Sequence, residues 1–361
     1  MSITHGIPKT EGIKYAGSKL KILPHIFEII SKLEVSSVLD GFSGTTRVSQ
    51  ALSKSGFRVV SNDISVWSEV FGTAYLLNKR EISHYLPIIE HLNAIKGYSG
   101  WFTEHYGGVE GNNDKRPFQV KNTMKLDAVR DEIENMGLDD IETAVALTSL
   151  ILAMDAVDNT LGHYVSYLSG WSKRSYNDMV LRVPMLFMNE NNNKVIRGDA
   201  FDAIGLEKYD LAYFDPPYGS NNEKMPPSRV RYNAYYHIWK TIILNDKPEL
   251  FGKANRREDS RDTKYSSVFE EYRKDESGNS ITMGAVQRLL KETNANYILL
   301  SYSQGGQGAK ENLYRIINES GELIQAMEID YKRNVMGQMK WTNKWISDDR
   351  SCIEYLFLLK K

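Results

Sequence analysis

Three observations on the sequence predict an α/β protein with a mixed, largely parallel sheet and a mostly helical insertion. Short apolar runs followed by acidic residues alternate with helical stretches toward both ends of the chain. Residues 79–190, between them, show helical periodicity without strand alternation. Two strand-like runs close the chain and are expected to pair as an antiparallel edge. By length, 361 residues correspond to roughly two domains or to one domain with an insertion.

Composition excludes several other classes. With 41% apolar and 25% charged residues, the chain is neither a disordered nor a collagen-like protein. The formal net charge of -1 means that any contact with a polyanion must come from local basic patches. A single cysteine, Cys352, allows no intrachain disulfide. Residues 1–10 lack a signal pattern and the most apolar stretch, 145–157, is too short to span a bilayer, so we expect a cytoplasmic protein without a membrane partner.

The first part of the fold, residues 1–78, contains a strand–helix–strand unit. Residues 35–39 form a short apolar strand that leads into Asp40, and a helix is expected over residues 45–55. A second strand over residues 58–60 leads into Asn62 and Asp63. This order is typical of parallel α/β proteins.

The insertion, residues 79–190, is expected to consist mainly of helices. Residues 97–117 are rich in Gly, Asn and charge and predict a loop. Residues 125–135 and 140–157 show helical periodicity, and the second stretch is almost wholly apolar, which predicts a buried helix.

The second part of the fold, residues 191–361, resumes the strand pattern. Strands are predicted at 194–197, 210–214 and 297–300, and the closing antiparallel pair at 323–329 and 352–359. The polar segment 219–280 is too long for an ordinary connection, so we expect a functional loop there.

The sharpest chemical signal is the tetrapeptide Asp215-Pro216-Pro217-Tyr218, directly after the strand 210–214. The carboxyl ends of parallel strands are where α/β folds bind ligands. The two prolines stiffen the turn and leave carbonyl oxygens free to accept hydrogen bonds. A plain rigid strand exit is the alternative interpretation, but it requires the strand, the acid and both prolines to coincide by chance.

This tetrapeptide after an apolar strand resembles the catalytic motif of adenine-specific DNA methyltransferases, of the Dam type and of restriction–modification systems. Further segments resemble other family motifs in the family's order: 14–19 (Lys-Tyr-Ala-Gly-Ser-Lys), 40–44 (Asp-Gly-Phe-Ser-Gly), Asp63, Asp199 and the strand end 301–303. The resemblance implies a Rossmann-like fold that depends on S-adenosylmethionine. It also implies methyl transfer to the exocyclic amino group of an adenine flipped out of duplex DNA.

The resemblance implies roles for residues in two sites. Asp215, Pro216, Pro217 and Tyr218 would form the catalytic site, with the Asp215 carboxylate and the Pro216 carbonyl accepting the adenine amino hydrogens and Tyr218 stacking on the base. The cofactor site would comprise Tyr15, Ala16, Gly17, Lys19, Asp40, Phe42, Ser43, Gly44, Thr45, Asp63, Asp199, Ala200, Phe201 and Asp215. No metal site is expected, because His105 and His163 lack ligand spacing.

Several cofactor assignments have structural alternatives. Lys19 is expected to bind the cofactor's carboxylate, although residues 14–19 are also compatible with a basic helix start. Asp199 either accepts the cofactor's adenine amino group or caps the next helix. Thr46 stands where the family usually has a second loop glycine, and its side chain would either crowd the cofactor or add a hydrogen bond.

Basic residues after the catalytic motif predict the DNA contact. Residues 224–264 contain ten Lys or Arg against five Asp or Glu, a net charge of +5, and residues 332–350 contain five basic against two acidic residues. The candidates are Arg229, Arg231, Lys253, Arg256, Arg257, Lys332 and Arg333. The insertion is the candidate for target recognition, and a cognate restriction endonuclease is a possible partner. Two alternatives remain: an RNA adenine or guanine methyltransferase, and a non-catalytic, cofactor-sensing protein that binds nucleic acid.

Overall fold

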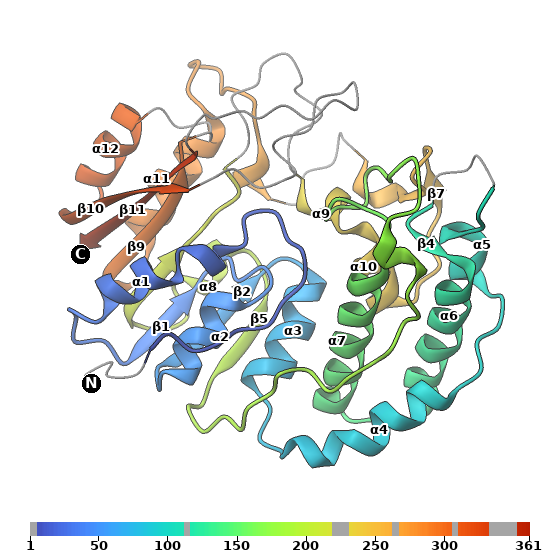
Figure 1. The fold of residues 1–361 in the computed structure, drawn as a ribbon. Helices are drawn as coiled ribbons and strands as arrows, with labels where there is room; N and C mark the ends of the chain where they lie inside the picture. Colours follow the sequence, from blue (N-terminus) through green and yellow to red (C-terminus); the bar gives the residue numbers. More distant parts are fainter. Residues whose placement is uncertain (1–5, 112–115, 219–230, 262–266, 305–309, 332–351) are drawn as a thin grey trace.

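The computed structural model describes residues 6–111, 116–218, 231–261, 267–304, 310–331 and 352–361. A seven-stranded sheet with helices on both faces lies beside a helical region (Figure 1). The strands follow the spatial order β10-β11-β9-β6-β1-β2-β5. In chain order they are β1 (Ser37–Asp40), β2 (Arg58–Asp63), β5 (Lys194–Arg197), β6 (Tyr209–Phe214), β9 (Ala295–Ser303), β10 (Glu322–Tyr331) and β11 (Cys352–Lys360).

The sheet confirms the predicted fold class. The five strands from β9 to β5 pair in parallel, whereas β11 is antiparallel to both β9 and β10. Every predicted strand overlaps an observed one. The closing pair is antiparallel as expected, but β11 lies inside the sheet and β10 alone forms that edge.

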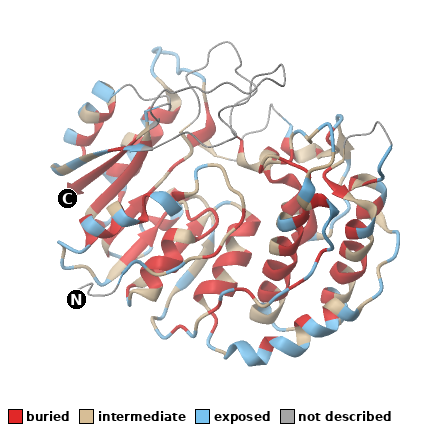
Figure 2. Cartoon of the chain, in the orientation of Figure 1, coloured by how far each residue is buried: buried red, intermediate tan, exposed pale blue. Residues whose placement is uncertain are grey.

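Alternate residues of each central strand serve two different cores. Val38 of β1 packs with α1 and α2 on one face, while the next residue, Leu39, belongs to the cluster formed with α8, α11 and α12 on the other. The helices on the two faces are η1 (Lys19–Lys21), α1 (Leu23–Ile30), α2 (Arg47–Lys54), α8 (Ala200–Ala203), α11 (Ile281–Glu292) and α12 (Lys310–Asn318). Figure 2 shows the resulting buried layer along the sheet.

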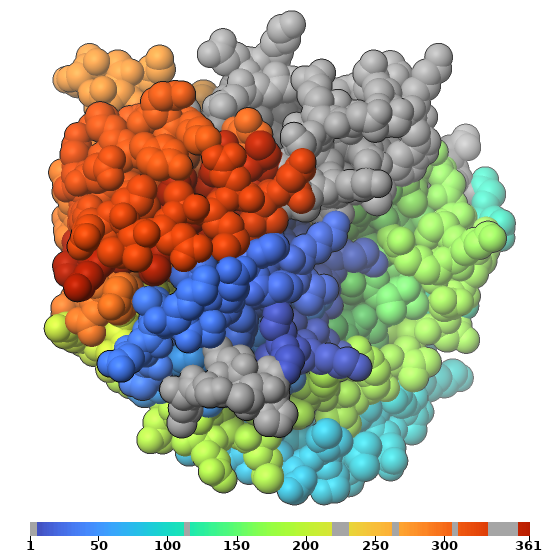
Figure 3. All heavy atoms as spheres, turned by 60° about the vertical axis from the view of Figure 1, so that its left-hand side comes forward, coloured from blue at the N-terminus to red at the C-terminus, as the bar shows by residue number. Residues whose placement is uncertain are grey.

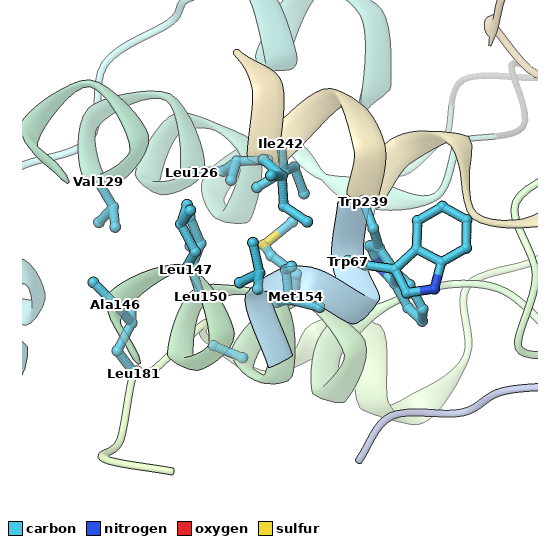
Figure 4. Packing of buried hydrophobic residues seen from close by; sticks show 14 of the residues in the cluster. Trp67, Leu126, Val129, Ala146, Leu147, Leu150, Met154, Leu181, Trp239 and Ile242 are labelled. Atoms are coloured by element: carbon cyan, nitrogen blue, oxygen red, sulfur yellow. The ribbon is translucent and has the colours of Figure 1, made fainter. Parts of the chain in front are cut away.

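The helical region is built around α7 (Asp140–Val157), which is buried on most sides and contacts α3, α4, α6 and α10 (Figure 4). Asp139 caps α7 by accepting from two backbone N–H groups, while Glu142 accepts from the Asp139 N–H. The surrounding helices are α3 (Val66–Leu76), α4 (Ile82–Ala94), α5 (Trp101–Tyr106), α6 (Val120–Asn135), α9 (Tyr232–Tyr235) and α10 (His237–Leu244). Because α3 and α10 contribute to the same core, this core extends beyond residues 79–190.

Short elements complete the described fold. They are the strands β3 (Gly107–Gly108), β4 (Phe118–Gln119), β7 (Leu250–Phe251) and β8 (Arg256–Arg257), with the 3₁₀ turns η2 (Lys173–Tyr176), η4 (Glu258–Ser260) and η5 (Val268–Glu270). None of the described helices has both the length and the hydropathy needed to cross a membrane.

Two expectations about loops were wrong. Helix α5 lies within the predicted loop 97–117, because the buried Asp127 of α6 accepts from the backbone N–H groups of Gly100, Phe102 and Thr103 and so caps α5 from a distance. Helix α10 lies within the predicted loop 219–280. Its buried side chains, Trp239 and Ile242 among them, pack against the helical region, and the surrounding charges masked this pattern in the sequence.

The position of a ligand site follows from the strand order. Neighbours of β1 are β2, the next strand in the chain, and β6, which follows much later. The strand order therefore reverses between β1 and β6, where open α/β sheets bind ligands beyond the carboxyl ends of the strands. Asp40 ends β1 and Asp215 directly follows β6, so both carboxylates lie at this point.

Candidate active site

A cleft opens at this end of the sheet. Its empty volume, including the open mouth, is about 890 Å³, which is in the range of small-molecule sites. It is lined by all the predicted cofactor residues except Phe201, whose ring instead stacks on Phe269 with centroids 5.7 Å apart. Of the catalytic tetrapeptide, Asp215 and Pro217 line the cleft.

The loop after β1 is held by its neighbours in the sheet. The Gly44 N–H donates to Asp63 Oδ2 at 2.9 Å, and the Ser43 N–H donates to the Asn62 carbonyl at 3.0 Å. Gly44 has a φ of 52°, and a Cβ there would lie 3.1 Å from the Tyr15 ring. A side chain here would combine a strained left-handed backbone with a close approach to the Tyr15 ring, so this position favours glycine.

Asp40 supplies a direct test of whether the cleft fits a cationic cofactor. Its Oδ2 accepts from Ser49 Oγ at 2.6 Å, but the buried Oδ1 has no hydrogen-bond partner among the described residues. Burial raises the pKa of Asp40 to about 7. An unpaired carboxylate oxygen in a cleft wall needs a donor or a cation, and the ammonium group of a methionine moiety has this chemistry.

Asp63 and Asp199 combine structural contacts with a place in the cleft wall. Asp63 Oδ1 accepts from the Ser65 N–H at 2.9 Å, so this carboxylate joins the cleft loop to the start of α3. Burial raises the pKa of Asp63, although the hydrogen bonds from the Gly44 and Ser65 N–H groups lower it. Asp199 caps α8 by accepting from the Phe201 N–H at 3.0 Å while also lining the cleft, so the helix-cap interpretation holds and the cofactor role stays a prediction.

Thr46 is not among the residues that line the cleft. It adopts the left-handed conformation with a φ of 60°, which is strained for a β-branched residue and natural for the glycine usual in the family. Its hydroxyl donates to the Thr45 carbonyl at 2.8 Å and accepts from Gln50 Nε2 at 3.1 Å. Neither of the two alternatives for Thr46, crowding the cofactor or adding a hydrogen bond to it, has support in this geometry.

The N-terminal motif runs between the sheet and the helical region. Figure 3 shows the N-terminal residues, in blue, between the C-terminal residues in orange and red and a green segment. The Ala16 N–H donates to the Tyr236 hydroxyl at 2.6 Å, and the Tyr232 hydroxyl donates to the Ala16 carbonyl at 3.2 Å. Lys14 Nζ lies 2.7 Å from Asp158 Oδ1, directly after helix α7.

The predicted catalytic carboxylate lies in a cluster of charged and hydroxyl groups. Lys19 Nζ is 2.8 Å from Asp215 Oδ1, 2.8 Å from the Tyr218 hydroxyl and 3.2 Å from Glu354 Oε1. The Tyr218 hydroxyl in turn hydrogen bonds to Asp215 Oδ1 and lies 2.6 Å from Glu354 Oε1. These contacts occupy the three donors of the Lys19 ammonium, so the structure gives Lys19 partners other than the predicted cofactor carboxylate.

Burial and neighbouring charges act in opposite directions on this cluster. Burial raises the pKa of Asp215 to about 6, although Lys19 lowers it, and the Glu354 charge raises it further. Burial would also raise the pKa of Glu354, but Lys19 and hydrogen bonds from Ser301 and Tyr218 lower it below the usual value. Burial would lower the pKa of Lys19, yet the two carboxylates raise it. The cluster therefore holds a cation between two carboxylates near neutral pH.

Several residues of the site escaped the sequence analysis. Tyr232 and Glu270 line the cleft, and Glu270 accepts from the Tyr232 N–H at 3.0 Å. Glu354, in β11, was missed although one signal pointed to it: an acidic residue inside an otherwise apolar strand. Such a residue requires a buried partner, which only the tertiary structure identifies.

The predicted DNA-binding residues divide into three groups. Arg229, Lys332 and Arg333 lie outside the described residues. Lys253 is exposed, and the Arg256 guanidinium lies over the Phe251 ring, 4.6 Å from its centroid. Two predictions need correction, because Arg231 and Arg257 are only 4% and 3% exposed. Arg257 bonds to Asp246 and Asp259, so its charge is neutralised inside the protein and does not reach a phosphate from this position.

Comparison with known proteins gives consistent matches. The profile of a family described as D12 class N6 adenine-specific DNA methyltransferase matches residues 15–303. Modification methylase StsI of Streptococcus sanguinis is 26% identical over 370 residues, covering 97% of this chain and 52% of the relative. Type II methyltransferase M.FokI of Planomicrobium okeanokoites is 28% identical, covering 97% and 53%. Type II methyltransferase M.NlaIII of Neisseria lactamica is 26% identical, covering 97% and 99%. The chain thus spans about half the length of the first two relatives and nearly all of the third.

Proposed function

The chain belongs to the D12 class of N6 adenine-specific DNA methyltransferases, and we propose that it methylates the exocyclic amino group of adenine at a specific site in duplex DNA. We further propose S-adenosylmethionine as the methyl donor and a role as the modification enzyme of a type II restriction–modification system, as the names of its relatives suggest. The observation that carries this proposal is the Asp215 carboxylate at the cleft, held on one oxygen by Lys19 and Tyr218.

The adenine amino group is a poor nucleophile because its lone pair is delocalised into the ring. Hydrogen-bond acceptors for its two hydrogens favour the tetrahedral geometry in which the lone pair is available. In the described structure, Lys19 and Tyr218 bond to Oδ1 of Asp215, and no described residue bonds to Oδ2. Asp215 Oδ2 and the Pro216 carbonyl would serve as the two acceptors.

S-adenosylmethionine supplies an electrophilic methyl group when it is bound. As the N6–methyl bond forms and the carbon–sulfur bond breaks, the amino nitrogen must lose a proton. Asp215, with a pKa of about 6, is an ionised acceptor at neutral pH. The base must leave the duplex first, at a cost of a few kcal/mol. Stacking on Tyr218, worth about 1–3 kcal/mol, would offset this cost.

The cleft residues would hold the cofactor through the chemistry of their side chains. The unpaired Oδ1 of Asp40 would accept from the ammonium group. Asp63 would accept from the ribose hydroxyls, because its carboxylate oxygens have lone pairs beyond those used by Gly44 and Ser65. Lys253 and Arg256 are the described basic residues proposed to contact DNA phosphates.

The test is methyl transfer to nucleic acid. The protein is incubated with S-adenosylmethionine and either unmethylated genomic DNA or total RNA, and the nucleosides are analysed by mass spectrometry. N6-methyladenine in DNA alone is expected. Asp215→Asn should lower the rate by about 10²–10³-fold without loss of DNA binding, and the exposed Asp202→Asn control should not. Methylation of RNA alone would overturn the DNA assignment, and cofactor binding without any product would favour the sensing alternative.

A further inference from the structure

Glu354 is the most deeply buried carboxylate of the catalytic cluster. Its residue is 1% exposed and lies in β11, between β9 and β10. The β9–β11 register pairs Glu354 with Ser303 and Leu356 with Ser301, so Ser301 and Glu354 lie on the same face of the sheet. Leu356 packs against α1 on this face. Helix α1 follows η1, which carries Lys19, so Lys19 approaches the sheet from the same face.

The Glu354 carboxylate has three donor groups around Oε1. Ser301 Oγ is 2.5 Å away, the Tyr218 hydroxyl 2.6 Å and Lys19 Nζ 3.2 Å. Glu354 is buried as well as absent from the cleft lining, so it is not placed to touch cofactor or base. A buried charge is costly unless it is paired. Of these three donors, Lys19 and Tyr218 also contact Asp215.

We infer that Glu354 is a positioning residue, which holds Lys19 and Tyr218 in place so that together they fix Oδ1 of Asp215 and leave Oδ2 to receive the adenine amino group. Lys19 bridges the two carboxylates, and the Tyr218 hydroxyl lies between the same pair. This inference rests on the proposed function for the role of Asp215, but the geometry it describes exists without substrate.

The arrangement gives Glu354 a distinctive effect on pH dependence. Asp215 faces Lys19 from η1, Glu354 from β11 and the Tyr218 hydroxyl from its own turn, with Asp40 at the end of β1 and Tyr232 from α9 nearby. The negative charge of Glu354 raises the pKa of Asp215. Replacing that charge by a neutral amide should therefore lower the pH at which Asp215 protonates.

The experiment compares Glu354→Gln with the wild type and with Glu328→Gln, a control on the neighbouring strand whose carboxylate is 46% exposed. The pH–rate profile of single-turnover methyl transfer is measured for each protein. On the plateau of this profile, Glu354→Gln should be about tenfold slower than the wild type. The acidic side of the profile, where the rate falls, should lie about one pH unit lower. The dissociation constant for S-adenosylmethionine should stay within about threefold. A plateau rate and an acidic fall in rate equal to those of Glu328→Gln would overturn the inference.

A second readout separates this inference from the proposed function. The Asp215 carboxyl is titrated by ¹³C NMR in protein labelled at aspartate, with its signal assigned by its absence in Asp215→Asn. Its pKa should be lower in Glu354→Gln even if the wild type transfers no methyl group. An unchanged pKa would refute the inference regardless of activity.

If Glu354→Gln fails to fold, Ser301→Ala provides a second test, because it leaves the charge of Glu354 in place. It removes one donor to Glu354, so the plateau rate should fall by several-fold, while the acidic side of the profile should not move to lower pH. Wild-type kinetics in Ser301→Ala would count against positioning by Glu354.

Discussion

Replacing Lys19 by Met removes the only cation that contacts both carboxylates of the described catalytic cluster, while keeping a side chain of similar length. An opposite charge this close, 2.8 Å from Asp215 Oδ1, lowers a carboxyl pKa by about 1–3 units. Its loss should therefore raise the pKa of Asp215 from about 6 to about 7–9. Since the proposed chemistry needs the ionised carboxylate, the variant should be impaired near neutral pH and should recover in alkali.

The expected recovery of the methyl-transfer rate at alkaline pH can be calculated from these pKa values. With a pKa of about 8, the ionised fraction of Asp215 at pH 7.5 falls from about 97% to about 24%, and at pH 9 it returns to about 91%. The methyl-transfer rate of Lys19→Met should thus rise about fourfold between pH 7.5 and 9, whereas that of the wild type should stay flat. Single-turnover rates at saturating DNA and S-adenosylmethionine measure this, with the exposed Lys21→Met as the matched control. A rate that does not rise with pH in a folded variant would refute the role given to Lys19.

Three further predictions concern the cofactor loop and the core. Thr46→Gly should change the dissociation constant for S-adenosylmethionine by less than about threefold in calorimetry, because the side chain does not line the cleft; much tighter binding would show that Thr46 crowds the cofactor. Asp63→Ala should weaken cofactor binding by at least about tenfold, as it removes a charged acceptor and the tie to Gly44, and unchanged affinity would contradict the ribose role. Leu150→Ala in α7 should lower the free energy of unfolding in urea by about 2–5 kcal/mol, because Leu150 is fully buried, and a loss as small as that of the exposed Ile82→Ala would disagree with this core.

The central strands and the two loops at their ends could be predicted from the sequence because their signals are local. Each strand is a short apolar run, and Asp40 and Asp215 follow two such runs directly. Parallel pairing then brings the carboxyl ends of these strands to one edge of the sheet. Neither step requires knowledge of the rest of the chain.

The errors have a common cause, since each depended on a contact between distant segments. Helix α5 begins where it does because Asp127 of α6 caps it, and α10 forms because the core around α7 buries its apolar side chains. Arg257 was assigned to DNA from local charge density, but Asp246 and Asp259 pair with it inside the fold. Charge density along the sequence does not reveal which charges are already paired.

The fold class, the family and the residue types at the cleft could be inferred from the sequence, because short apolar runs and short motifs are properties of neighbouring residues. The bonding partners of those residues depend on the tertiary structure. Lys19, near one end of the chain, meets Asp215 from its middle part and Glu354 from near its other end, because η1 lies over the face of the sheet to which β11 contributes Glu354. The charge state of a buried carboxylate depends on distances of a few ångströms in space, and no local pattern in the sequence encodes those distances.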